Sequence, residues 1–262
     1  MRVNGAAGRA LPSIARLYAR DITDELGAAR IFVLSPHPDD ETLGCGATIS
    51  RVVQSGGSAV VIIATDGSLG IPTVPSNITA ATRREEVIAA TETLGVESRN
   101  LVLLQLPDAT LSDKEAYLKK LVEEVLEDRR PDTVFSPSVF DTHPDHAALG
   151  RAARAALCDR GIRHLEYLIW GWNQPFRLSA RLLRQRDTGQ RLPGRPVRVR
   201  SHGYESTKAQ ALACHRSQVA PDATLFGVPL EGTGGMDNGF LKHFDHSSEI
   251  FFPGPSCAIQ PT

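Results

Sequence analysis

The feature that most constrains this fold is a series of short, largely apolar runs separated by helical patterns. The runs cover residues 31–34, 59–64, 101–106, 132–136 and 165–170. Because most of them do not alternate apolar with polar residues, they indicate strands buried on both faces. Helices between the strands favour a parallel sheet covered on each side. The sequence therefore predicts an α/β fold with a mostly parallel sheet.

The remaining organisation follows from the same alternation. We expect helices at 12–26, from Asp40 onward, and at 79–94, 111–129 and 147–158. The alternation lapses after residue 174, where only a strand at 195–200 and a helix at 204–217 are predicted. The expected division is a helical leader at 1–30, a core of alternating strands and helices at 31–174, and a small C-terminal extension, 175–262, packed on the same domain.

Composition excludes several classes of protein. With 262 residues and a formal net charge of −1, the chain gives no reason to expect attraction to nucleic acids or membranes. No apolar run has the length of a transmembrane span, and residues 1–30 lack the apolar core of a signal peptide. The four cysteines show no paired spacing, so we expect free thiols and a cytoplasmic protein.

The first polar cluster follows the first predicted strand. Pro36 and Pro38 prevent that strand from continuing, and His37, Asp39 and Asp40 lie at its carboxyl end. His37 and Asp40 are three residues apart, so their side chains can converge, whereas Asp39 must project elsewhere. The alternative is that the carboxylates cap the next helix.

A second cluster follows the fourth predicted strand. His143, Asp145 and His146 repeat the spacing of the first cluster after Pro137. In the common strand order 3-2-1-4-5, strands 1 and 4 are neighbours at the point where ligands bind. We therefore expect the two clusters to meet in space.

Together the clusters suit a catalytic metal. His37, Asp40 and one histidine of the second pair form a two-histidine, one-carboxylate set, which is typical of catalytic zinc and also of ferrous oxygenases. Asp39 is then free to act as general base toward a metal-activated water. The other histidine can stabilise an oxyanion or protonate a leaving amine, with Asp145 as its partner. The set predicts metal-assisted amide hydrolysis.

These residues carry a family resemblance. Ser35-Pro-His-Pro-Asp-Asp-Glu-Thr-Leu-Gly-Cys-Gly46 with His143-Pro-Asp-His146 resembles the PIG-L (LmbE-like) zinc-dependent N-acetylglucosaminyl deacetylases. The resemblance spans about residues 31–218. It implies a Rossmann-like three-layer sandwich and one zinc ion per chain, with another divalent transition metal as the alternative.

The resemblance also implies residue roles. His37, Asp40 and His146 would be the metal ligands, Asp39 the base, and His143 the acid or oxyanion stabiliser with Asp145 as its partner. Arg83 and Asp108 would bind substrate. The stretch from Lys208 to Gln218 resembles a later family segment, for which a packing helix is the alternative.

The expected function is zinc-dependent removal of an N-acetyl group from a small amino-sugar conjugate containing N-acetylglucosamine. Two alternatives stay open: an amidase that releases a larger acyl group, and a non-catalytic metal- or carbohydrate-binding module. The sequence also leaves open whether the chain forms a homo-oligomer. We expect substrate specificity to reside in loops such as 68–78 and 171–194.

Overall fold

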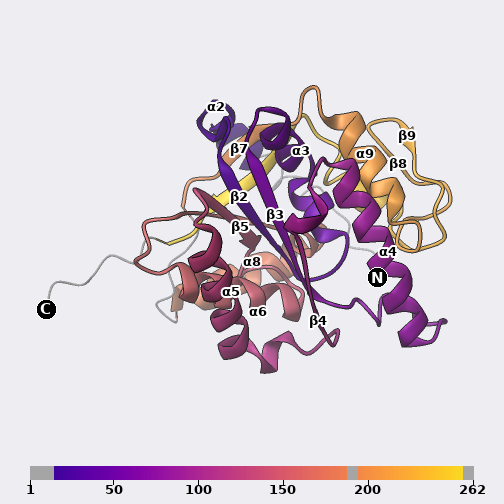
Figure 1. Cartoon of the computed structure of the whole chain (residues 1–262), viewed down its shortest axis with the longest axis horizontal. Coiled ribbons are helices and arrows are strands. Elements are labelled where there is room, and N and C mark those ends of the chain that lie inside the picture. Colours follow the sequence, from indigo (N-terminus) through magenta and orange to yellow (C-terminus); the bar gives the residue numbers. More distant parts are fainter. Residues whose placement is uncertain (1–14, 188–193, 256–262) are drawn as a thin grey trace, which may run out of the picture.

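A central sheet organises the protein. The computed structural model describes residues 15–187 and 194–255, and within them eight strands form one sheet in the order β1-β7-β10-β6-β5-β2-β3-β4 (Figure 1). The strands are β1 (Arg20–Asp21), β2 (Arg30–Ser35), β3 (Ser58–Thr65), β4 (Leu101–Leu106), β5 (Thr133–Pro137), β6 (Arg163–Tyr167), β7 (Val197–Arg200) and β10 (Ser248–Pro253). A separate ribbon pairs β8 (Thr224–Leu225) with β9 (Val228–Pro229).

The predicted parallel core is confirmed. β2 pairs in parallel with β3 on one side and with β5 on the other, and β4 and β6 extend the parallel set. The order β4-β3-β2-β5-β6 is the expected 3-2-1-4-5 order of the five predicted strands. The carboxyl ends of β2 and β5, which carry the two polar clusters, are therefore neighbours.

Helices cover both faces of the sheet. The labelled helices of the described residues are α2 (Thr23–Leu26), α3 (Asp40–Gln54), α4 (Ser76–Thr93), α5 (Glu115–Arg129), α6 (Pro144–Leu157), α7 (Trp170–Asn173), α8 (Pro175–Asp187), α9 (Glu205–Cys214) and α10 (Asn238–Leu241), with 3-10 turns at Ser98–Asn100 and Leu111–Asp113. Figure 1 shows α4 and α9 on one side of the strands, and α5 and α6 on the other.

Side chains of β2 alternate between two hydrophobic cores. Ile31 and Val33 pack with residues of α3, α4 and α9, whereas Phe32 and Leu34 pack with residues of α5 and α6. This alternation follows from the two-residue period of a strand. Because both faces are covered, residues 31–34 of the strand are all apolar and buried, as the continuous run predicted.

The single helix expected at 12–26 is wrong in its middle. Residues 15–18 are helical, but Arg20 and Asp21 form β1, which pairs in parallel with β7. The Asp21 carboxylate then accepts a hydrogen bond from the backbone N–H of Thr23, where α2 begins. Tertiary pairing with a distant strand overrides the local helical pattern. Residues 12–14 of that prediction lie outside the described residues.

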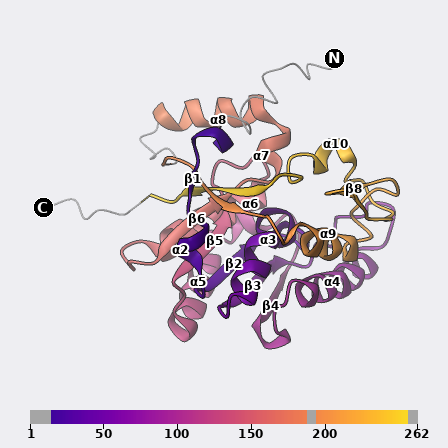
Figure 2. The same cartoon turned by 90° about the horizontal axis from the view of Figure 1, so that it is seen from above.

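The C-terminal part extends the same sheet. β10 lies between β6 and β7 and runs antiparallel to both, as the yellow strand in Figure 2 shows. Its Glu249 is buried, lies 2.7 Å from the Lys208 ammonium of α9, and accepts hydrogen bonds from Ala47 and Thr48 of α3. These contacts hold α9 and β10 against the helix that follows the first cluster. The predicted boundary at residues 174/175 stays a prediction.

The cysteines depart in part from expectation. Cys45 and Cys214 are free thiols, but Cys158 is disulfide-bonded, contrary to the free thiol predicted for it. Disulfides are most common in oxidising compartments, so one ground for a cytoplasmic location is weakened, and that location stays a prediction.

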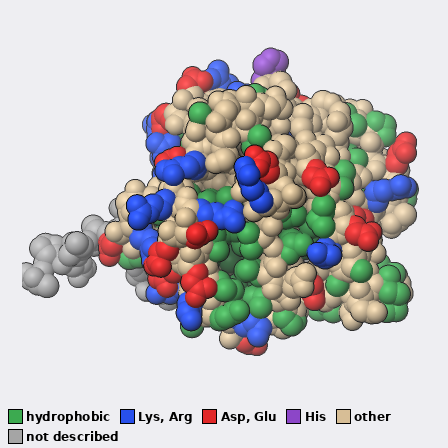
Figure 3. Space-filling model, in the orientation of Figure 1, with side chains coloured by type: hydrophobic (Ala, Val, Ile, Leu, Met, Phe, Trp, Pro, Cys, Tyr) green, Lys and Arg blue, Asp and Glu red, His purple; other side chains and the backbone are tan. Residues whose placement is uncertain are grey.

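The surface carries mixed charge. Acidic and basic side chains are interspersed over the face in Figure 3, in keeping with the near-zero net charge. Among the described residues, no helix combines the length and apolar character needed to span a membrane.

We expect Gly150→Ala to destabilise the fold next to the second cluster. A Cβ atom at Gly150 of α6 would lie 2.6 Å from the carbonyl oxygen of Pro137 and 2.9 Å from the amide nitrogen of Val139. Overpacking against backbone costs about 1–3 kcal/mol, so denaturant unfolding should give a lower free energy of unfolding by that amount. Gly235→Ala is the control, because its Cβ would meet no atom within 4 Å. Equal stability of the two variants would contradict this packing.

Candidate metal centre and active site

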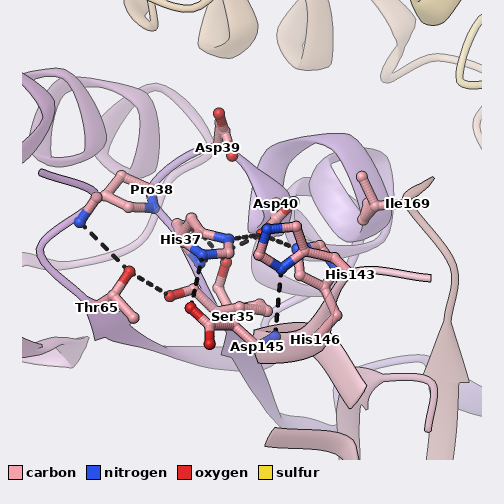
Figure 4. Close-up of polar contacts among 12 residues, drawn as sticks. Ser35, His37, Pro38, Asp39, Asp40, Thr65, His143, Asp145, His146 and Ile169 are labelled. Carbon is pink, nitrogen blue, oxygen red and sulfur yellow. Dashed lines mark hydrogen bonds and ion pairs between the residues drawn. The ribbon is translucent and has the colours of Figure 1, made fainter. Parts of the chain in front are cut away.

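Two proline-terminated strand ends build the site. β2 ends at Ser35, and Pro36 to Asp39 form a short turn before α3 begins at Asp40. β5 ends at Pro137, and His143 is the N-cap of α6. The sequence order strand, proline, histidine, helix thus places each histidine between a strand end and a helix N-terminus. Figure 4 shows the two segments facing each other.

The predicted ligands meet as expected. One carboxylate oxygen of Asp40, Oδ2, lies 3.1 Å from Nδ1 of His37 and 3.1 Å from Nε2 of His146. The rings of His37 and His146 have centroids 5.2 Å apart, and His143 lies 4.9 Å from each of them. Residues more than a hundred positions apart in the sequence therefore share one small volume.

The histidine and carboxylate groups fit a divalent cation. Ligand atoms of His37, His143 and His146 lie within 4.8 Å of one another, as do those of His37, Asp108 and Asp145. His146 is fully buried, yet neither ring nitrogen has an aligned hydrogen-bond partner among the described residues. Buried polar atoms are nearly always satisfied, so these nitrogens suit a metal bond. The donor types are compatible with zinc and with other transition metals.

Electrostatics point the same way. Burial opposes the charged form of His37, but hydrogen bonds with Asp108, Asp145 and Asp40 outweigh it and raise the pKa of the imidazole well above its usual value. Burial also opposes the charged form of His146, yet Asp40 and Asp141 raise its pKa to about 9. The surrounding carboxylates thus favour positive charge here, which imidazolium protons or a divalent cation can supply.

Asp39 is separate from this cluster. Its side chain points away from the contacts of His37, Asp40 and His146 (Figure 4), and Oδ2 accepts a hydrogen bond of 2.9 Å from Arg83 of α4. Burial raises the pKa of Asp39 to about 7, because Arg83 offsets only part of that effect. The expectation that the two adjacent carboxylates project differently is confirmed.

Arg83 and Glu86 do not form the surface pair that their spacing suggests. Arg83 is buried and donates to Gly67 and Pro38 carbonyl oxygens as well as to Asp39. Glu86 instead accepts two hydrogen bonds of 2.7 Å from Ser217, beyond the end of α9. Spacing of three residues on a helix permits a pair, but stronger long-range partners replace it here.

Asp145 and His143 contact each other differently from the prediction. The backbone N–H of Asp145, and not its carboxylate, faces Nδ1 of His143 at 3.3 Å. The carboxylate accepts backbone hydrogen bonds from Ala109 and Leu111 and lies 3.3 Å from Nε2 of His37. Because Asp145 lies in the first turn of α6, its side chain reaches the neighbouring loop, whose N–H groups need an acceptor. Its catalytic role stays a prediction.

Asp108 and Asp141 complete the surroundings. Asp108 follows β4, and its Oδ1 lies 3.2 Å from Nε2 of His37. Asp108 therefore contacts the histidine cluster directly, in addition to the substrate-binding role expected for it. Asp141 was not predicted: its Oδ2 lies 3.3 Å from Nδ1 of His146 and accepts the N–H of Ile169. A carboxylate that faces the far nitrogen of a ligand histidine orients the ring. The five-residue separation from His146 was the available signal.

A cavity of about 590 Å³ opens onto these groups. His37, Asp39, Asp40, Arg83, Asp108 and His143 line its polar side. Leu69 and Gly70 come from the predicted specificity loop, and Gln218 ends the stretch that resembles a later family segment. Trp170, Met236 and Phe240 also line the cavity, and the last two were missed because the chain after residue 218 gave no site pattern. Residues 188–193 of the second predicted loop lie outside the described residues.

Comparison with known proteins identifies a family domain within the chain. The PIG-L family model, described as GlcNAc-PI de-N-acetylase, matches residues 32–157. Residues 32–157 are a PIG-L domain. The resemblance identified from the two motifs is therefore confirmed.

Curated relatives of this PIG-L domain carry the names of deacetylases. Diacetylchitobiose deacetylase of Thermococcus kodakarensis is 32% identical over 138 residues, covering 51% of this chain and 51% of that protein. A 1D-myo-inositol 2-acetamido-2-deoxy-alpha-D-glucopyranoside deacetylase of Kineococcus radiotolerans is 28% identical, covering 58% and 54%. The chain thus spans about half the length of these two curated relatives.

Solved structures show the same fold. A zinc-inhibited form of teicoplanin deacetylase superposes with a TM-score of 0.66 at 18% identity, covering 86% of this chain and 97% of the other. At that identity the likeness concerns the fold alone. The match covers more of the chain than residues 32–157 alone.

Metal content tests the ligand assignment. We expect His146→Ala to lose bound zinc after dialysis, because a two-ligand remnant binds a divalent ion weakly, whereas Asp39→Asn should keep it. Zinc per chain can be measured by elemental analysis of the folded variants. Full zinc occupancy in His146→Ala would refute the assignment.

Proposed function

We propose that the chain hydrolyses the N-acetyl group of a small molecule that contains N-acetylglucosamine, with Asp39 as general base and zinc as the metal. Support comes from the PIG-L domain and from relatives that carry deacetylase names. The observation that carries the proposal is the separation of the two adjacent carboxylates. Asp40 faces the histidines at 3.1 Å, while Asp39 lines the same cavity and, among the described residues, its side chain forms a hydrogen bond with Arg83 alone.

His37, Asp40 and His146 would hold the ion. A divalent metal in that position supplies an acidified water and polarises the amide carbonyl. Asp39, at the cavity wall, accepts the proton of the attacking water and later delivers it to the departing amine. Arg83 keeps the Asp39 carboxylate directed toward the cavity through the 2.9 Å hydrogen bond.

His143 would stabilise the oxyanion. Its Nδ1 accepts the backbone N–H of Asp145, so the neutral ring carries its proton on Nε2. His143 lines the cavity, and an N–H donor there can bind the negative charge that develops on the carbonyl oxygen. This favours oxyanion stabilisation over proton donation, the two roles left open by the sequence.

Substrate contacts would come from polar and from aromatic residues of the cavity lining. Asp108 can accept hydrogen bonds from sugar hydroxyls, and Arg83 borders the same space. Trp170 and Phe240, with ring centroids 5.3 Å apart, form an aromatic part of the cavity lining. Apolar faces of pyranose rings or of an attached group pack well on such walls.

Asp39→Asn tests the base directly. We expect kcat for acetate release from N-acetylglucosamine conjugates to fall about 10²- to 10⁴-fold, because an amide cannot accept the proton of the attacking water. KM and zinc content should change little. Asp113→Asn, at an exposed carboxylate outside the cavity, is the matched control.

Other results would redirect the assignment. Release of only larger acyl groups would favour the amidase alternative. Wild-type turnover by Asp39→Asn would contradict Asp39 as base, and a chain that binds zinc and sugar without any acyl release would favour a binding module.

A further inference from the structure

Asp39 has an unusual backbone. Its φ is +125° and its ψ is −31°, whereas the other described non-glycine residues with positive φ lie between 41° and 60°, in or near the small left-handed region that side chains tolerate. A conformation of this kind persists only where surrounding contacts fix it. The strain falls on the residue proposed as general base.

Glu41 holds the strained peptide. Its Oε2 accepts the backbone N–H of Asp39 at 3.0 Å, and its carboxylate also accepts hydrogen bonds from Thr42 and Ser35. Glu41 is completely buried. A buried carboxylate is stable only when it is paired or fully hydrogen-bonded.

His215 is the partner of that carboxylate. Its Nε2 lies 3.2 Å from Oε1 of Glu41, and both side chains have no solvent exposure. The other ring nitrogen, Nδ1, has no hydrogen-bond partner among the described residues. The contact with Glu41 is therefore the only side-chain hydrogen bond of this imidazole in that part of the chain.

The position of His215 is itself fixed to the active site. It follows α9, and Ser217 two residues later bonds to Glu86 of α4, the helix that carries Arg83. Arg83 in turn donates to the carbonyl oxygen of Pro38. The turn after α9 thus contacts Asp39 by two routes. His215 pairs with Glu41, which accepts the Asp39 N–H, and Ser217 bonds to α4, whose Arg83 bonds to the Asp39 carboxylate.

We propose that Glu41 and His215 are positioning residues that hold the Asp39 backbone in its strained conformation and so direct the base carboxylate into the cavity. This inference rests on the proposed function, in which Asp39 accepts the proton of the attacking water. Neither residue touches the cavity, which His37, Asp39, Asp40 and Arg83 line. Both act through the Asp39 peptide.

His215→Leu and His215→Gln separate positioning from packing. Leu fills similar space without a donor, whereas the side-chain amide of Gln can replace Nε2 as donor to Glu41. We expect His215→Leu to lower kcat about 10- to 100-fold, since small displacements of catalytic groups have effects of that size, with KM changed less than about twofold and zinc content unchanged. His215→Gln should restore most of kcat.

Leu212→Ala is the matched control for stability. Leu212 is a fully buried residue of α9, the helix that His215 follows, and its apolar side chain has no group that can donate a hydrogen bond to Glu41. Hydrogen exchange of the Asp39 amide is compared under conditions in which the two variants have the same free energy of unfolding. Exchange should then be faster in His215→Leu than in Leu212→Ala. Equal exchange in the two variants, or a kcat loss no larger than that of Leu212→Ala, would overturn the inference.

A double variant keeps the test open if His215→Leu does not fold. Glu41→Gln with His215→Leu leaves no unpaired buried charge, and its kcat should be no lower than that of Glu41→Gln alone, since both residues act on one peptide. A kcat of the double variant well below that of Glu41→Gln would overturn the inference. If the wild-type chain releases no acetate from any acetylated sugar, the proposed function fails, while the amide exchange comparison still decides the positioning role.

Discussion

The pairing of β2 with β5 is the constraint on which the site depends. Ile31, Phe32 and Val33 are in register with Thr133, Val134 and Phe135, and both strands end at prolines. Parallel pairing brings the two carboxyl ends to one edge of the sheet, where each chain turns into a helix through a histidine. Side chains from distant parts of the sequence then lie about 3 Å apart without any specialised loop to join them.

The adjacent carboxylates Asp39 and Asp40 differ in proposed role because their surroundings differ. Asp40 lies in the first helical position and faces two imidazoles, so its charge is fixed by His37 and His146. Asp39 lies in a strained turn and faces Arg83 and the cavity. In the proposed mechanism, Asp40 would bind the cation and Asp39 would take part in proton transfer. The strained backbone of Asp39 is held by the buried hydrogen bond to Glu41, whose carboxylate pairs with His215, a residue outside the PIG-L domain.

Much of this could be predicted from the sequence because its signals are local. Continuous apolar runs with proline stops gave the five core strands, and the rule for parallel sheets gave their order. The spacing of His37 and Asp40 gave their convergence. Each of these inferences needs only neighbouring residues and general packing rules.

The rest depends on contacts that have no local pattern. Pairing of β1 with β7, the insertion of β10 between β6 and β7, and the bond from Ser217 to Glu86 all join segments far apart in the sequence. Arg83 and Glu86 show why helical spacing alone misleads, since each has a better partner outside its helix. His215 stood alone in the sequence, and only the fold brings it to Glu41.

Zinc-edge anomalous diffraction from crystals loaded with stoichiometric zinc tests the central claim most directly. The account predicts one strong peak bounded by His37, Asp40 and His146, with the Asp39 carboxylate outside its coordination sphere. A peak on the opposite side of His37, between Asp108 and Asp145, or one bound by Asp39 itself, would contradict it.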